Sequence, residues 1–94
     1  LIYGTIKGYK VNRETGDKIS GALFGLFRAD ETSFTEDNAY LTAESGEDGV
    51  FTFENVVYGA YTVRELRPAA GYLENETVYP VTVDKAATWS RSPW

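Results

Sequence analysis

Apolar and polar residues alternate along most of this chain with a period of two. Phe51 and Phe53, for example, alternate with Thr52 and Glu54. Such alternation is typical of β-strands with one buried face, and stretches rich in Gly, Asp and Asn, which favour turns, separate the alternating segments. We predict strands at residues 2–12, 20–28, 40–44, 50–55, 60–67, 76–83 and 86–91. Seven short strands joined by turns indicate an all-β fold, either an antiparallel β-sandwich or a small barrel.

One segment, from Arg28 to Asn38, departs from this pattern because it is polar and has no period of two. We expect a loop there, or a single short helical turn. A chain of 94 residues has room for one hydrophobic core, so we predict a single domain over residues 1–94. The sequence opens on Leu1 with neither Met nor a signal peptide, which indicates a piece of a longer protein.

Cysteine and histidine are both absent from the sequence. Without them the chain has no disulfide, no thiolate metal site and no Ser-His or Cys-His pair for nucleophilic catalysis. We therefore expect no enzyme activity, no metal and no cofactor. The net charge of −5 argues against a nucleic-acid partner, which would require clustered Lys and Arg. No run of ~18 apolar residues occurs, so we expect no membrane insertion.

Two charged residues fall on strand faces that the alternation assigns to the core. Ile2 and Ile6 share a face with Lys10, and Val63 shares a face with Glu65. Burying an isolated charge is unfavourable, so such groups pair or become neutral. The two residues form either an ordinary buried ion pair or a reactive pair. The second interpretation arises because an apolar site lowers the pKa of a lysine and raises that of a glutamate, and a neutral amine is a nucleophile.

Several motifs, taken in order, resemble those of a known family. Residues 8–16 read Gly-Tyr-Lys-Val-Asn-Arg-Glu-Thr-Gly and residues 19–24 read Ile-Ser-Gly-Ala-Leu-Phe, and both resemble the opening of a Cna B-type (SpaA-like) domain. Residues 49–53 and 58–65 are similar to its Gly-x-Tyr-x-Phe and Pro-Gly-x-Tyr-x-Leu-x-Glu segments. Pro-Ala-Ala-Gly-Tyr at residues 68–72 resembles its Ala-Pro-x-Gly-Tyr loop. Each motif is weak alone, but their order and spacing are specific.

The resemblance implies a seven-stranded, transthyretin-like β-sandwich that serves as a structural stalk or spacer module in a Gram-positive pilin or adhesin. It implies an extracellular location, cell-wall anchoring through the parent protein, and neighbouring domains of the same protein as partners. Many members of the family form a spontaneous isopeptide bond between a lysine on the first strand and an Asn or Asp on the last. Carried onto this chain, the resemblance makes Lys10 the nucleophile and Glu65 the acid that assists it.

The acceptor of such a bond is not evident in the sequence, because residues 85–94 contain neither Asn nor Asp. Asp84 is the nearest candidate, although Pro80 and Thr82 share its strand face and a turn role also suits it. Asn75, in the loop before the sixth strand, fits the family position less well.

The last strand is therefore expected to be atypical or truncated after about residue 85. Two alternatives stay open: a natural member that lacks the bond, and the strand-accepting half of a split ligation pair, which takes an Asn- or Asp-bearing peptide strand in trans.

Two other kinds of site have simpler explanations. Acidic residues at 30–31 and 44–49 would supply carboxylate ligands for calcium, but their spacing matches no EF-hand and suits solvated turns. Tyr58, Tyr72, Trp89 and Trp94 would form a sugar-binding platform, but core packing and loop anchoring account for aromatic residues at these positions. An adhesive module that binds a host ligand is a further alternative for the function.

Overall fold

The computed structural model describes residues 1–90, which form seven strands and no helix. The strands are β1 (Tyr3–Tyr9), β2 (Leu23–Arg28), β3 (Leu41–Glu44), β4 (Val50–Val57), β5 (Gly59–Arg67), β6 (Val78–Val83) and β7 (Ala87–Trp89). The predicted all-β, seven-stranded fold is confirmed. Arg91, where the predicted last strand ends, and Trp94 lie outside the described residues. Within residues 1–90 the structure has no helix of the length and apolar character that would cross a membrane.

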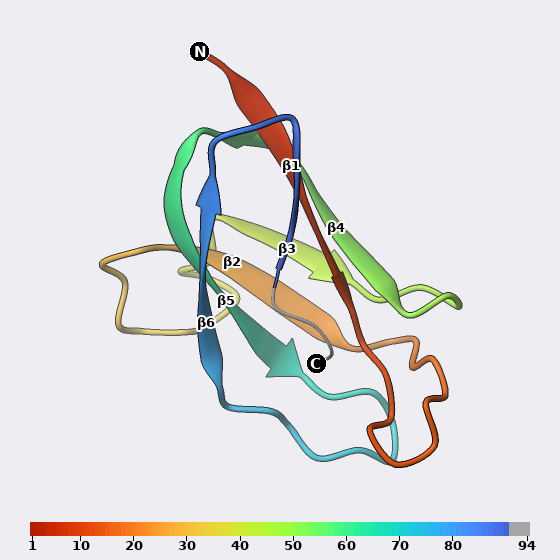
Figure 1. Ribbon diagram of the computed structural model, residues 1–94. Coiled ribbons are helices and arrows are strands. Elements are labelled where there is room, and N and C mark those ends of the chain that lie inside the picture. Colours follow the sequence, from red (N-terminus) through yellow and green to blue (C-terminus); the bar gives the residue numbers. More distant parts are fainter. Residues whose placement is uncertain (91–94) are drawn as a thin grey trace.

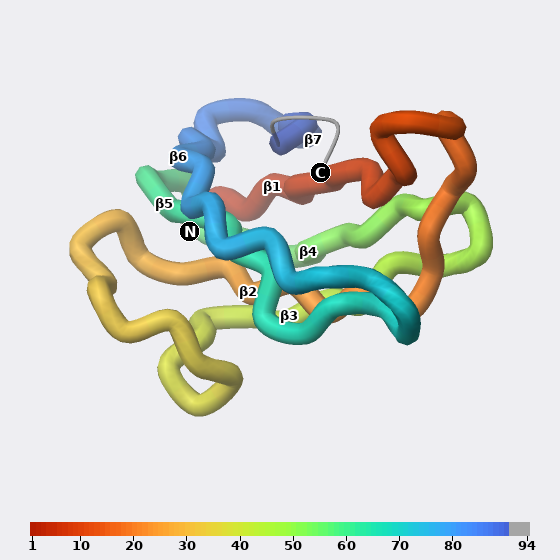
Figure 2. Tube along the Cα trace, turned by 90° about the horizontal axis from the view of Figure 1, so that it is seen from below, coloured from red at the N-terminus to blue at the C-terminus, as the bar shows by residue number. Residues whose placement is uncertain are grey.

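The strands form two sheets that pack face to face (Figures 1 and 2). One sheet has the order β4-β1-β7 and the other has the order β3-β2-β5-β6. The pairing is antiparallel except between β1 and β7, which run parallel with Ile6 opposite Thr88. This parallel pair arises because the chain crosses from β6 in one sheet to β7 in the other, whereas a tight hairpin would have paired antiparallel.

The core lies between the two sheets and is rich in aromatic rings. Phe24 of β2 and Phe51 of β4 come from different sheets, and their rings stack with centroids 3.9 Å apart and an angle of 10° between the planes. The inward faces of the strands make up most of the rest of the core, and Ile19, Ala22 and Ala69 come from the connections between strands. These buried residues are Ile6, Ile19, Ala22, Leu26, Phe53, Val56, Tyr61, Val63, Ala69, Val81 and Val83.

Strand β2 is buried on both faces, which the alternation does not indicate. Phe27 points away from the inter-sheet core yet is fully buried, because the connection between β2 and β3 covers it. The Phe34 ring of this connection packs edge-on against Phe27, with centroids 5.0 Å apart. Residues 29–38 thus form a loop with turns that shields the outer face of the second sheet, and Arg28 ends β2.

The first strand is shorter than predicted at both ends. Ile2 precedes β1 and is 66% exposed, so its predicted inward orientation is wrong. Regular pairing with β4 ends at Tyr9, and Val11 forms only an isolated bridge with Lys18. The Asn12 side chain stabilises the turn that follows, because its Oδ1 accepts hydrogen bonds from the backbone N–H groups of Glu14 and Thr15.

The side chain of Tyr61 in β5 forms a hydrogen bond with the backbone at the end of β4. Its hydroxyl donates a 2.5 Å hydrogen bond to the Val57 carbonyl, and burial, with a contribution from Tyr40, raises the pKa of the phenol. The neutral form therefore stabilises the fold below pH ~10, and this contribution is lost as the pH rises through the raised pKa. We expect Tyr61→Phe to lower the free energy of unfolding by ~1 kcal/mol at pH 7.

The variant should also lose less stability than the wild type between pH 9 and pH 11, as measured by urea unfolding at each pH. Tyr72→Phe, at an exposed residue, is the matched control. Equal alkaline destabilisation of the wild type and Tyr61→Phe would contradict this assignment.

Candidate functional site

Lys10 lies immediately after β1 and keeps the inward orientation that the alternation predicts. Both of its backbone groups are held: its N–H donates to the Gly49 carbonyl at 2.7 Å, and its carbonyl accepts from the Ile19 N–H at 3.0 Å. Gly49 has a φ of 77°, and a Cβ at that position would lie 2.7 Å from the Lys10 carbonyl oxygen. This close approach requires glycine. The backbone of Lys10 is therefore fixed, and its side chain enters the protein with the residue only 7% exposed.

Glu65 reaches the same place from the other sheet. It follows Tyr61 and Val63 on the inward face of β5, and Phe24 of β2 is its partner in the sheet register. Its exposed fraction is 0%. A carboxylate in such a position is unfavourable unless it is paired or neutral.

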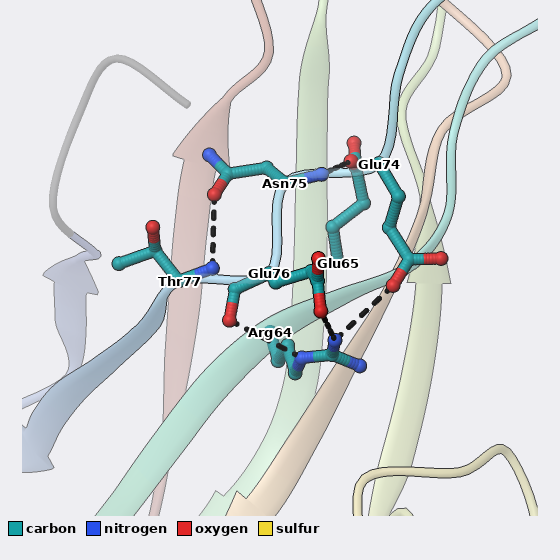
Figure 3. A network of polar contacts seen from close by, with 6 residues as sticks. All are labelled: Arg64, Glu65, Glu74, Asn75, Glu76 and Thr77. Carbon is teal, nitrogen blue, oxygen red and sulfur yellow. Dashed lines mark hydrogen bonds and ion pairs between the residues drawn. The ribbon is translucent and has the colours of Figure 1, made fainter.

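The two side chains, which the phasing of their strands places inward, meet between the sheets. Lys10 Nζ lies 3.3 Å from Glu65 Oε2. Glu65 Oε1 accepts a 2.6 Å hydrogen bond from the backbone N–H of Asn75 (Figure 3). Among the described residues Oε2 has no hydrogen-bond partner, so Lys10 approaches it as an ion pair without hydrogen-bond geometry. One oxygen of the carboxyl group is thus fixed by the backbone, while the other faces the amine.

A surface pocket of about 240 Å³ is lined in part by Lys10. It lies where the loop after β1 and the loop before β6 come together at one end of the sandwich (Figure 1). Its lining includes Lys10 and Asn12 from the first loop and Tyr72, Leu73 and Asn75 from the second. A side chain from another segment would therefore have room to approach the lysine.

The structure places the two candidate acceptors differently, with Asn75 beside the Lys10–Glu65 pair and Asp84 away from it. Asp84 is exposed and lies in the β6–β7 connection, near the start of β1, where the Lys85 carbonyl closely approaches Gly4. Lys10 is six positions further along the extended chain than Gly4, so the Asp84 backbone lies on the order of 20 Å from the Lys10 backbone.

Asn75 is close to the site, but its side-chain Oδ1 accepts a hydrogen bond from the Thr77 N–H. The contact of its backbone with Glu65 has no signature in the sequence, because any residue except proline supplies an N–H.

The other sites considered from the sequence remain apart. Among residues 1–90, no three acidic side chains are placed to share a metal ion. Tyr72 lines the pocket beside Lys10, whereas Trp89 stacks on Tyr9 with ring centroids 4.8 Å apart. Tyr58 lies near the start of β1, where its N–H donates to the Ile2 carbonyl. These aromatic residues form no common platform in the described part of the chain.

A comparison with protein families identifies the fold. The sequence model described as SpaA, prealbumin-like fold domain, matches residues 4–92. The chain belongs to this SpaA family. This match confirms the resemblance drawn from the motifs at residues 8–24, 49–65 and 68–72. No curated protein sequence compared with the chain is significantly similar to it.

Solved structures with this fold include pilus backbone proteins of streptococci and a protein of Bacillus anthracis. The T6 backbone pilin of Streptococcus pyogenes serotype M6 has a TM-score of 0.74 and 23% identity, over 87% of this SpaA domain and 16% of that chain. The pilus 2b backbone protein of group B streptococcus has a TM-score of 0.74 and 20% identity, over 95% of this domain and 40% of that chain.

The Bacillus anthracis TIE protein has a TM-score of 0.78 and 22% identity, over 94% of this domain and 16% of that chain. This SpaA domain therefore spans less than half the length of these three proteins.

Proposed function

We propose that the chain is a structural stalk or spacer module of an extracellular pilin or adhesin, anchored to the Gram-positive cell wall through the protein that contains it. Membership of the SpaA family and the similarity to domains of longer pilins support this role. Neighbouring domains of the same protein are then its partners. The buried Lys10–Glu65 pair is the observation that carries the chemical part of the proposal.

In this proposal Lys10 forms an isopeptide bond with an Asn or Asp side chain, assisted by Glu65. Transfer of a proton from Lys10 Nζ to Glu65 Oε2 leaves a neutral amine and a neutral acid, which need less solvation in the core than two charges. Nζ then attacks the side-chain carbonyl carbon, and the acid stabilises the charge that develops on the oxygen.

Collapse of the tetrahedral intermediate breaks the C–N bond of Asn or the C–O bond of Asp. Glu65 gives its proton to the leaving group, which departs as ammonia or water, and takes up in exchange the proton that Nζ loses as the amide forms. No external catalyst is required, because the folded chain holds the reactants at high effective concentration.

In this proposal the acceptor side chain comes from a segment that lies next to Lys10, further along the chain of β1 than the stretch paired with β7. Within residues 1–90, β7 pairs with β1 from Thr5 to Lys7, and the Ser90 N–H donates to the Lys7 carbonyl. The pocket next to Lys10 lies beyond this paired stretch and has room for a further residue. The same geometry favours the second candidate function, a module that accepts a peptide strand from another molecule, because strand addition uses such an edge.

Intact-mass measurement tests the role of Lys10. We expect the chain, incubated with an excess of a ten-residue peptide of alternating Val and Thr with one inward Asn, to form an adduct. Its mass should be the sum of the two minus about 17 Da, or about 18 Da if Asp replaces the Asn. Lys10→Arg should abolish the adduct, and Lys7→Arg, on the outer face of β1, should retain it.

A mass deficit of the same size in the chain alone would place the acceptor within the chain. If Lys10→Arg removed this deficit, the role of Lys10 as nucleophile would be supported as well as by the adduct. An adduct that survives Lys10→Arg would exclude Lys10. Failure of the wild type to show either a deficit or an adduct would remove the isopeptide part of the proposal and leave the structural role.

A further inference from the structure

Two neighbouring residues of β5 hold the same short segment of the loop before β6 (Figure 3). Arg64 Nη2 lies 3.1 Å from Glu74 Oε2 and 3.8 Å from Glu76 Oε1, and Arg64 Nε donates a 3.4 Å hydrogen bond to the Glu76 carbonyl. Glu65 accepts the Asn75 N–H between these two contacts. Adjacent strand residues point to opposite faces, so Glu65 contacts the segment on the core side of β5 and Arg64 contacts it on the other side.

Arg64 differs in burial from the other arginine near this end of β5. The Arg64 side chain is 16% exposed, and its guanidinium lies 5.8 Å from the Phe34 ring centroid. Arg67 is 56% exposed, and its nearest carboxylates are 3.8 Å away. Ion pairs at exposed positions contribute little, whereas shielded arginine–carboxylate contacts with hydrogen bonds contribute more. Arg64 is therefore the residue that anchors the segment, and Arg67 offers a matched comparison.

We propose that Arg64 is a positioning residue for Glu65: by anchoring residues 74–76 it keeps the Asn75 N–H on Oε1 and leaves Oε2 as the oxygen that exchanges a proton with Lys10. This inference rests on the proposed isopeptide chemistry. An oxygen that already accepts a short N–H hydrogen bond has less capacity to carry the acidic proton. The proton that leaves Lys10 Nζ therefore goes to Oε2, 3.3 Å away, and returns from there to the leaving group.

Arg64→Met tests the anchor, with Arg67→Met as the matched control. Native-state hydrogen exchange at the Asn75 amide reports the anchor directly and requires no cross-link. We expect exchange at Asn75 to accelerate at least about tenfold in Arg64→Met and to change less than about twofold in Arg67→Met. Unchanged exchange at the buried Phe53 amide would show that the fold is intact. An Asn75 amide that stays as protected as in the wild type would overturn the proposal.

Substitutions at residue 75 separate the backbone donor from the side chain. Asn75→Pro removes the N–H, whereas Asn75→Ala keeps it and removes only the contact with Thr77. We expect the ¹³C resonance of the Glu65 carboxyl group to move in Arg64→Met and Asn75→Pro, and to stay in place in Arg67→Met and Asn75→Ala. The rate of adduct formation should fall about tenfold or more in the first two variants, with an altered pH profile.

These measurements distinguish the two proposals. If wild type and variants all fail to form an adduct, the isopeptide chemistry fails, and with it the catalytic part of the inference. The anchor would still be judged by the exchange at Asn75 and by the Glu65 resonance. If the wild type reacts and Arg64→Met reacts at the same rate with the same pH profile, the positioning role is overturned while the isopeptide proposal stands.

Discussion

Glu65→Ala is expected to lower the free energy of unfolding by about 3–5 kcal/mol in chain whose intact mass shows no cross-link. The substitution leaves the Lys10 amine buried without its partner and removes the acceptor of the Asn75 N–H. It also opens space in the core beside Phe24, the register partner of Glu65. Urea unfolding followed by far-UV circular dichroism measures the loss, and an unchanged m-value would show that the two-state comparison holds.

Two further variants serve as a control and as a rescue for Glu65→Ala. Glu76→Ala removes a carboxylate from a side chain that is 83% exposed and should leave the stability unchanged. The double variant Lys10→Met/Glu65→Leu replaces both charged groups by apolar ones. It should recover most of the lost stability, because no buried charge is then left without a partner. The Asn75 N–H stays unpaired in the double variant, so recovery should fall short by ~1 kcal/mol or more. A loss below ~1 kcal/mol in Glu65→Ala would show that water reaches the pair.

Recovery in the double variant would bear on why the pair exists. A buried ion pair is weak evidence for stability, because well-packed apolar residues often replace it without loss. Lys10 and Glu65 occupy positions that apolar residues would fill, and their contact lacks the geometry of a strong hydrogen bond. The proposed isopeptide chemistry accounts for such a pair, so adduct formation and equilibrium unfolding test two properties of the same residues.

The alternation of residues predicted the parts of the site that depend on strand phase alone. It placed Lys10 and Glu65 on inward faces because side chains on a strand alternate strictly between its two sides. That the two residues meet depends also on which strands lie opposite, and the family resemblance supplied this. The period failed for Ile2, because β1 begins one residue later and the phase carries no information beyond the end of a strand.

The remaining features arise from contacts between segments distant in sequence. The parallel pairing of β7 with β1 depends on how the chain crosses between sheets, and the loop that covers Phe27 depends on Phe34. The hydrogen bond from Asn75 to Glu65 uses a backbone N–H. None of these has a periodic signature, since a loop residue is placed by its tertiary contacts and not by its neighbours in the chain.

The stacked pair of Phe24 and Phe51 carries the other large expected effect. Phe24→Ala should lower the free energy of unfolding by about 3–5 kcal/mol, because it removes a fully buried ring and leaves a cavity between the sheets. The ring contacts its counterpart at a centroid distance of 3.9 Å across the two sheets, so little of this space can be filled by movement within one sheet. Urea unfolding and the shift in melting temperature both measure the effect.

Phe34→Ala makes the same chemical change outside the inter-sheet core and serves as the control. Phe34 is only half-buried and packs on the outer face of the second sheet, so its loss should be less than half that of Phe24→Ala. Similar losses in the two variants would contradict the assignment of the core, because they would show that the loop over β2 stabilises the domain as much as the packing of one sheet on the other. The ratio of the two losses therefore measures how far the stability of the domain depends on the packing of one sheet on the other.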